Sequence, residues 1–127
     1  MTAWSNFAAV GGGAAMGAWL RWGLGLWLNP LLAAFPLGTL VANLLGGFLM
    51  GIALALLQAM PALPVAQKLL LTTGFLGGLT TFSSFSGEVF DLLQRQAYAW
   101  AGITIALHVI GSLLMTWLGW WCMHAWR

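Results

Sequence analysis

The chain has 127 residues, of which 61% are hydrophobic and only 5% are charged, and its formal net charge is +2. Soluble domains carry about 25% charged residues, so this composition argues against a soluble domain, and the small charge argues against nucleic-acid binding. No Asp, Glu, Lys or Arg occurs in residues 22–67 or 96–126. Because about 20 apolar residues span a bilayer, the composition predicts an all-α membrane protein.

Four hydrophobic segments fill the sequence. The first covers about residues 4–28 and ends at 29–36, a stretch with a proline near each end. The second covers about 37–58, the third about 65–93 and the fourth about 98–123. The nine tryptophans gather near the proposed ends, which is typical of the aromatic belts at membrane interfaces. We therefore predict a single four-helix transmembrane domain over residues 1–127.

The basic residues are balanced between the two sides of the membrane. Four spans place Lys68 and Arg127 on one side, and Arg21 and Arg95 on the other. The positive-inside rule then gives no preferred orientation. Two interpretations stay open: a weak bias from groups outside this count, such as the terminal amine, or a dual topology in which chains insert both ways and pair antiparallel.

Glycines recur at helical spacing in three of the spans. Small residues allow helix backbones to approach closely in lipid, so we expect packing faces there. Four helices of this size form a solid bundle with little room for an internal route. A transport path would therefore lie between subunits, and we expect a dimer. The glycines concerned are Gly13, Gly17, Gly47, Gly51, Gly74, Gly77 and Gly78.

Polar residues inside the spans are costly and are usually functional or paired. Asn43 lies in the second span, and its alternative role is a hydrogen bond between helices. In the fourth span a polar residue recurs every four positions, which keeps the set near one helix face. The alternative for its hydroxyls is a bond to the carbonyl of their own helix. This set is Thr104, His108, Ser112 and Thr116.

The third span contains the string "GGLTTFSSFSGE" at residues 77–88. Two glycines are unfavourable in a helix interior, and the threonines can cap a second helix that begins near Phe82. We therefore predict that this helix is broken near 77–81. Such breaks are tolerated in a membrane where they are buried in protein or line a wet cavity, and they present free backbone groups to ions.

Phe82 and Phe85 lie three residues apart and so near one helix face. A phenyl ring has a positive edge. Ring edges, hydroxyls and the Asn43 amide could together hold a small anion without a fixed charge, which would bind too tightly for rapid passage. The alternative is that both rings fill a hydrophobic core.

Charged residues near the span ends have simpler interpretations. Glu88 and Asp91 are predicted to pair with Arg95 at a helix end. Arg21 is expected to extend toward the interface, and its charge could also attract anions to a vestibule.

Three strings resemble the signatures of the CrcB/Fluc fluoride channels. They are "GGGAAMGAWLRW" at residues 11–22, "GTLVANLLGGFLMG" at 38–51 and "GFLGGLTTFSSFSGE" at 74–88. The resemblance extends over the whole length, and "TTFSSF" after a double glycine is its most specific part.

The resemblance implies an antiparallel, dual-topology homodimer in a bacterial inner membrane, with two pores that export fluoride passively. It implies no enzymatic activity. It also implies a structural Na⁺ on the dimer axis, held by backbone carbonyls of Gly77 and Thr80. Arg21 and Glu88 would be vestibule residues, while Thr104 and His108 receive no role. The residues that would line the fluoride pore are Asn43, Thr81, Phe82, Ser84, Phe85, Ser112 and Thr116.

Other functions fit the sequence less well. A small proton-coupled multidrug exporter also has four spans, but it would need a carboxylate inside the membrane. The first two spans contain no acid, and Glu88 and Asp91 lie near a helix end. A structural packing subunit would explain the glycines but not the hydroxyl-rich break, and no nucleophile–base pair or metal cluster suggests an enzyme.

Overall fold

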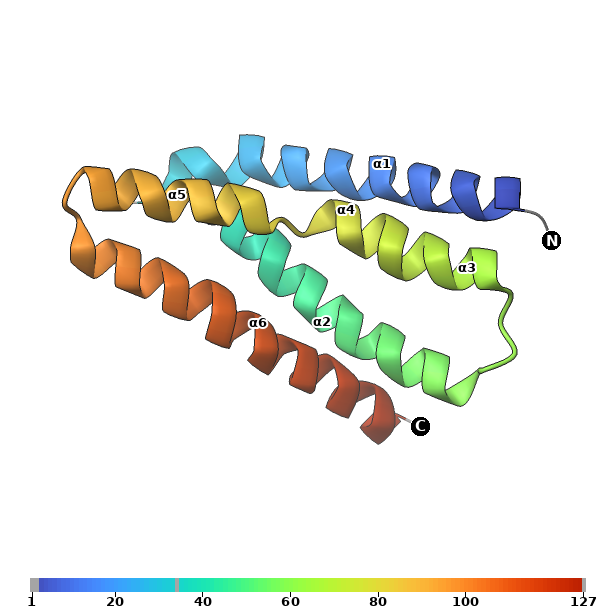
Figure 1. Ribbon diagram of the computed structural model, residues 1–127. Helices are drawn as coiled ribbons and strands as arrows, with labels where there is room; N and C mark the ends of the chain where they lie inside the picture. The colour runs from blue at the N-terminus through green and yellow to red at the C-terminus, as the bar shows by residue number, and fades with distance from the viewer. Residues whose placement is uncertain (1–2, 34, 127) are drawn as a thin grey trace.

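The computed structural model describes residues 3–33 and 35–126, and this part of the chain is helical, without strands. Four helical segments follow one another, and the third is divided (Figure 1). The first is α1 (Ala3–Leu28), followed by a 3-10 turn (Asn29–Leu31), and the second is α2 (Leu37–Ala59). The third consists of α3 (Val65–Leu69), a π-helical stretch (Leu70–Leu76), α4 (Gly77–Leu79) and α5 (Phe82–Gln94); the fourth is α6 (Tyr98–Trp126).

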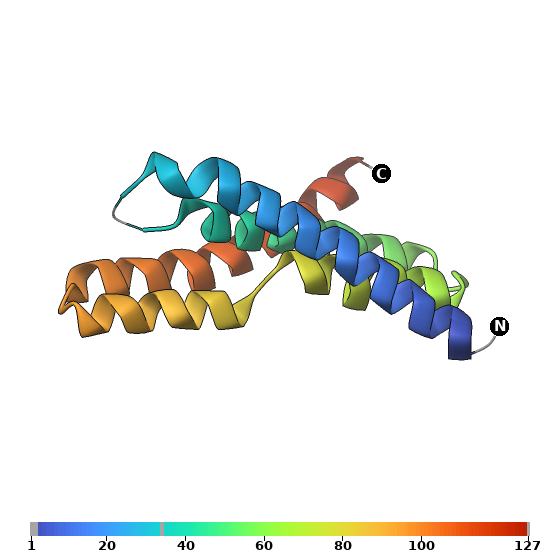
Figure 2. The ribbon, with the colours of Figure 1, turned by 90° about the horizontal axis from the view of Figure 1, so that it is seen from above.

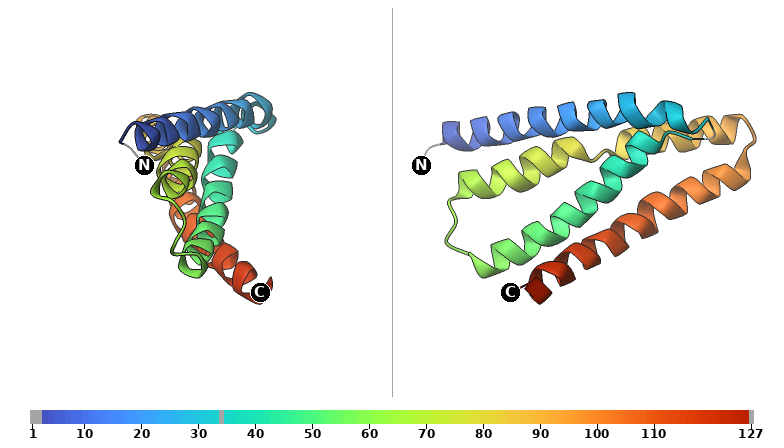
Figure 3. Two further views of the ribbon diagram at one scale, coloured as in Figure 1. Left: turned by 90° about the vertical axis from the view of Figure 1, so that its right-hand side faces the viewer. Right: turned by 180° about the vertical axis from the view of Figure 1, so that it is seen from behind.

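The segments run lengthwise and alternate in direction. The N-terminus, the α2–α3 turn and the C-terminus lie at one end, and the α1–α2 and α5–α6 turns lie at the other (Figure 1). The two termini are on opposite sides of that shared end (Figures 2 and 3). The main contacts are those of α2 with α6, and of α1 with the π-helical stretch and α4. The divided third segment therefore lies against α1 at one end and against α6 at the other.

Glycines bring α1 and the third segment into backbone contact. A Cβ added at Gly13 would lie 2.5 Å from the Leu70 carbonyl oxygen, and one at Gly17 would collide with the Phe75 carbonyl oxygen. Gly74 and Gly78 form the opposite side, where added Cβ atoms would meet the backbone of α1. The predicted packing faces are confirmed here.

The contact between α2 and α6 is built in the same way. A Cβ at Gly47 would lie 2.9 Å from the Ser112 carbonyl oxygen, and one at Gly51 would collide with the Thr116 carbonyl oxygen. Gly77 is different, because the nearest atom to its added Cβ is the Thr72 oxygen, at 3.7 Å. Within the single chain Gly77 makes no close backbone contact with another segment, so its packing role stays a prediction.

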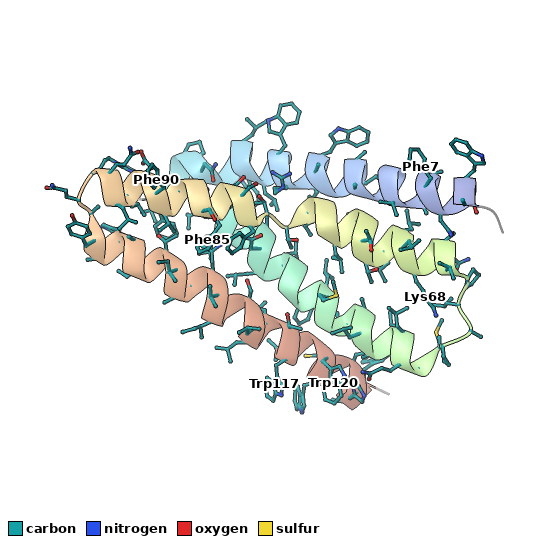
Figure 4. The ribbon with its side chains drawn as sticks, viewed as in Figure 1. Phe7, Lys68, Phe85, Phe90, Trp117 and Trp120 are labelled. Atoms are coloured by element: carbon teal, nitrogen blue, oxygen red, sulfur yellow. The ribbon has the colours of Figure 1, made fainter. Side chains whose placement is uncertain are left out.

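The outer surface of the chain is strongly apolar. Trp4, Phe7 and Leu113 are 77%, 73% and 68% exposed, and Phe7 and Trp117 project outward from α1 and α6 (Figure 4). Soluble monomers rarely expose large contiguous apolar patches. By length and composition, α2 and α6 are the described helices that could cross a membrane. The architecture is that of an all-α protein whose surface suits lipid or a partner chain.

Candidate functional site: a cleft at the divided third segment

The backbone leaves the helical conformation at Thr80 and Thr81. Both residues are extended, with φ/ψ of −90°/156° and −150°/119°. The Thr81 hydroxyl accepts a hydrogen bond from the Ser84 amide at 3.1 Å and so caps α5. The Thr80 hydroxyl instead donates to the Leu76 carbonyl at 2.9 Å. We call Thr80 and Thr81, between α4 and α5, the interruption. The Thr80 hydroxyl bonds a carbonyl of the helix before it, and the Thr81 hydroxyl bonds an amide of the helix after it.

Asn43 connects α2 to this interruption and to α6. Its Oδ1 accepts from the Thr81 amide at 2.8 Å, and its Nδ2 donates to the Thr81 carbonyl at 3.1 Å. Nδ2 also lies 2.9 Å from Nδ1 of His108. The hydrogen bond between helices that was considered for Asn43 is therefore present. Its main partner is backbone, so Asn43 fixes the extended conformation of Thr81.

A cleft of about 490 Å³ opens beside this cross-link. Its walls come from α2, the interruption, α5 and α6. It brings together most of the residues predicted to line a pore, together with both proposed carbonyl ligands of sodium. These are Asn43, Thr81, Phe82, Phe85, Ser112 and Thr116, with Gly77 and Thr80.

Ser84 lies apart from that group. It lines two other pockets, one of about 250 Å³ with Arg21 and one of about 560 Å³ with Glu88. Thr81 belongs to both the cleft and the smaller pocket. The structure thus places Ser84 with the two residues expected in a vestibule, and Thr81 between them and the cleft.

The two phenylalanines have different environments. Phe85 is only 7% exposed and points from α5 toward α6 (Figure 4), where its ring centroid lies 4.7 Å from that of His108. Phe82 is 76% exposed and meets Phe85 edge-on at 5.5 Å. The core interpretation therefore describes Phe85 better than Phe82, although both rings line the cleft.

Some of the polar side chains on α6 form their hydrogen bonds with the backbone of the same helix. The Thr104 and Thr116 hydroxyls donate to the carbonyls of Trp100 and Ser112, at 2.8 and 3.0 Å. Thr104 is fully buried and does not line the cleft, whereas Ser112, Thr116 and His108 do. The alternative role of these hydroxyls, a bond to a carbonyl of their own helix, is therefore confirmed for Thr104 and Thr116.

The expected pairing of Arg95 is confirmed for Asp91 and is wrong for Glu88. The Nε of Arg21 donates to the Gly78 carbonyl at 3.1 Å, and the extension of this side chain toward the interface stays a prediction. Arg95 pairs with Asp91, at 2.6 Å, whereas Oε1 of Glu88 is buried without a hydrogen-bond partner among the described residues. The Gly78 carbonyl in α4 accepts from the guanidinium, and i,i+4 spacing favours Asp91 over the more distant Glu88 as the partner of Arg95.

At the interruption, backbone carbonyl oxygens are the atoms that could act as ligands of a cation. In a continuous helix the Thr81 amide would bond the Gly77 carbonyl, but here it donates to Asn43. The extended ψ of Thr80 also turns its carbonyl away from the helical direction. Hard cations prefer oxygen ligands, so the carbonyl oxygens of Gly77 and Thr80 are suitable ligands for such a cation. The described residues contain no group of three His, Cys, Asp or Glu side chains that could bind a metal ion.

Two features of the site were missed from the sequence. The polar repeat on α6 pointed to His108 but gave no indication that its partner was Asn43. The bond between Arg21 and Gly78 had no sequence signal at all, because a backbone carbonyl leaves no trace in residue types.

Comparison with known proteins places this geometry in a family. Residues 8–120 match the family of CrcB-like proteins, Camphor Resistance (CrcB). A protein of Aromatoleum aromaticum named "Fluoride-specific ion channel FluC" is 60% identical, over 95% of this chain and 92% of its own length. Proteins of the same name from Pseudomonas putida and Pseudomonas aeruginosa are 59% and 53% identical, over 87% and 95% of both chains. The chain belongs to the CrcB family.

Proposed function

We propose that this protein is a fluoride-selective channel through which cytoplasmic fluoride leaves a bacterial cell across the inner membrane. The cleft is the observation that carries the proposal. It combines amide, hydroxyl and phenyl-edge groups, and none of the Asp, Glu, Lys or Arg side chains that the structure describes lines it. Such a lining offers an anion many weak donors and no tight trap, as conduction requires. The relatives named as fluoride channels support the same function.

Passive flow suffices for export. An inside-negative potential drives an anion outward by about 2.3 kcal/mol per charge for every 100 mV. The main alternative, a proton-coupled multidrug exporter, would place a carboxylate in the transport path. The cleft has none, and Glu88 lies in a different pocket. The comparisons do not favour the exporter either.

The working unit is an antiparallel homodimer of chains with dual topology, and it contains two pores. The cleft of a single chain is open on one side and bordered by Phe82, which is 76% exposed. A second chain could complete the wall there. The balanced basic residues and the apolar surface of each chain support this arrangement, in which all four segments of each subunit cross the membrane.

A sodium ion on the dimer axis fits the carbonyls of Gly77 and Thr80. When bound, it would supply positive charge that holds the two interruptions together. Asn43 supports such a site indirectly, since its bond to the Thr81 amide frees the Gly77 carbonyl from a helical partner.

The function is tested by fluoride efflux from liposomes that contain the purified protein, with a potassium ionophore to dissipate the potential. A fluoride electrode records the flux, and a parallel run follows chloride. We expect rapid loss of fluoride while chloride is retained. Retention of fluoride by liposomes that contain well-folded protein would contradict the proposal.

Phe82→Ile is expected to slow fluoride efflux by about tenfold or more, which corresponds to about 1.4 kcal/mol, because the aliphatic side chain has no positive ring edge. The fold should persist, since the residue is largely exposed. Phe90→Ile is the matched control, because Phe90 lies on the same helix, is 61% exposed and is absent from the cleft. Equal flux in the two variants would remove Phe82 from the pathway.

Dual topology can be measured with one engineered cysteine. Gln96 is exposed in the α5–α6 turn, and Cys122 is the only native cysteine. In a Gln96→Cys, Cys122→Ser variant, a membrane-impermeant maleimide added to spheroplasts should label about half of the chains, since balanced charge gives no preferred orientation. The other half should react only after lysis. Labelling of nearly all or nearly none before lysis would show a single orientation.

A further inference from the structure

Arg21 is a charged side chain of α1 that is bonded to the backbone of another segment. Its Nε donates to the Gly78 carbonyl at 3.1 Å, in a partly buried contact. This contact is within reach because α1 approaches α4 closely one helical turn earlier, where a Cβ added at Gly17 would lie 3.0 Å from the Gly78 carbonyl carbon. Arg21 therefore connects α1 to the last helical residues before the interruption.

The backbone carbonyls around the interruption have different partners. In a continuous helix the Gly78 carbonyl would accept from the amide four residues later, but the backbone is extended at the interruption. Arg21 supplies a donor for this carbonyl. The Leu76 carbonyl accepts from an amide and a hydroxyl of the interruption, and the Thr81 carbonyl accepts from Asn43. The carbonyls that the chain itself holds are thus next in sequence to the two proposed sodium ligands.

The helix that carries one of these ligands cannot fix its own geometry. The element α4 has three residues, Gly77–Leu79, and an isolated helix of this length has no stability of its own. Its first two residues are glycines, which have the largest backbone freedom. A carbonyl binds an ion well when hydrogen bonds behind it fix its direction. The direction of the Gly77 carbonyl therefore depends on what holds the next peptide, and Arg21 holds it.

We infer that Arg21 is a positioning residue of the sodium site, which acts by holding the Gly78 carbonyl so that the neighbouring Gly77 carbonyl stays directed as a ligand. This inference rests on the proposed function. The charge of the guanidinium is not the cause, because a positive group opposes a nearby cation. The hydrogen bond is the cause, and this distinguishes the role from attraction of anions to a vestibule, which depends on charge.

Two neutral substitutions separate the bond from the charge. In Arg21→Gln the side-chain nitrogen stands at the position of Nε and can keep the bond to Gly78, whereas Arg21→Met has a methyl group there and no donor. The sodium dissociation constant follows from the rise in melting temperature as sodium replaces N-methyl-D-glucamine at constant ionic strength, since a ligand of the native state stabilises it by mass action. We expect a constant at least about tenfold higher in Arg21→Met than in Arg21→Gln, as for other residues that orient metal ligands.

Arginine NMR of the wild-type protein gives a readout that does not require Arg21→Met to fold. With ¹⁵N-labelled arginine in nanodiscs, the Arg21 Nε–H resonance is the one that Arg21→Gln lacks. Sodium should shift it relative to N-methyl-D-glucamine at equal ionic strength. Arg95 is the internal control, because its side chain is 60% exposed and paired with Asp91, and its resonance should stay in place.

The inference would be overturned by equal sodium constants in the two variants, or by an Arg21 resonance that sodium left unchanged. A merely structural role would lower the melting temperature of Arg21→Met at every sodium concentration and leave its sodium constant at that of Arg21→Gln. Fluoride efflux is recorded on the same preparations. A wild-type protein that moved no fluoride would refute the proposed channel, and the sodium titration would still decide whether Arg21 positions the site.

Discussion

Asn43→Asp is expected to reduce fluoride efflux by about 100-fold or more, which corresponds to about 2.7 kcal/mol. The carboxylate keeps the acceptor for the Thr81 amide but loses both hydrogens of Nδ2. The Thr81 carbonyl then loses its donor, and an unsatisfied buried group costs about 1–3 kcal/mol; His108 can instead place its proton on Nδ1 and donate to the carboxylate. A new negative charge also faces the cleft and repels the ion that must pass.

Gln58→Glu is the matched control for this experiment. It introduces the same amide-to-carboxylate change on the same helix, at an exposed position outside the described pockets. The Gln58 side-chain oxygen accepts from Trp120 at 3.3 Å, and a carboxylate can continue to do so. We expect less than about a threefold change in flux, in line with the small effects of most surface substitutions. Similar losses in both variants would mean that charge alone, rather than the cross-link at Thr81, explains the Asn43 phenotype.

Size-exclusion chromatography of both variants should accompany the flux measurement. A well-folded Asn43→Asp protein with low flux would assign the effect to the cleft. Normal flux through a folded Asn43→Asp protein would contradict the role of Asn43, because neither the lost bonds nor the added charge would then matter for passage.

The sequence located the helical segments well because their boundaries have chemical causes. Prolines stand at the α1–α2 and α2–α3 turns, and the chain has few residues outside apolar runs. The capping threonine could also be anticipated, since a hydroxyl before a helix start satisfies a free amide. The π-helical stretch Leu70–Leu76 could not, because no residue pattern in it distinguishes a π-helix from an α-helix.

The candidate site was harder to predict where its partners are backbone atoms. Asn43 was recognisable as a polar group in an apolar span, yet its bonds end on the amide and carbonyl of Thr81. Phe82 and Phe85 are indistinguishable as residue types, and only the position of α6 makes one exposed and the other buried. Ser84 shares the spacing of its neighbours, but the rotation of α5 turns it toward the pockets of Arg21 and Glu88. These distinctions depend on tertiary packing.

Gly17→Ala is expected to destabilise the protein by about 1–3 kcal/mol, the usual cost of overpacking. The added Cβ would collide with the Phe75 carbonyl oxygen and lie 2.6 Å from the Leu79 nitrogen. Both are backbone atoms that cannot rotate away, so α1 must separate from the third segment. That separation would also strain the bond from Arg21, one helical turn further along α1, to Gly78. We therefore expect a lower apparent melting temperature in detergent and reduced fluoride flux.

Gly12→Ala and Gly23→Ala are the controls for this substitution on the same helix. An added Cβ at either position meets no atom within 4 Å, and alanine is favoured over glycine in a helix by about 1 kcal/mol. Both controls should therefore melt no lower than the wild type. If Gly17→Ala also melted at the wild-type temperature, the close approach at this position would not contribute to stability. A lower melting temperature in Gly17→Ala alone would show that the backbone contact between α1 and the third segment holds the interrupted helix in place, and with it the cleft.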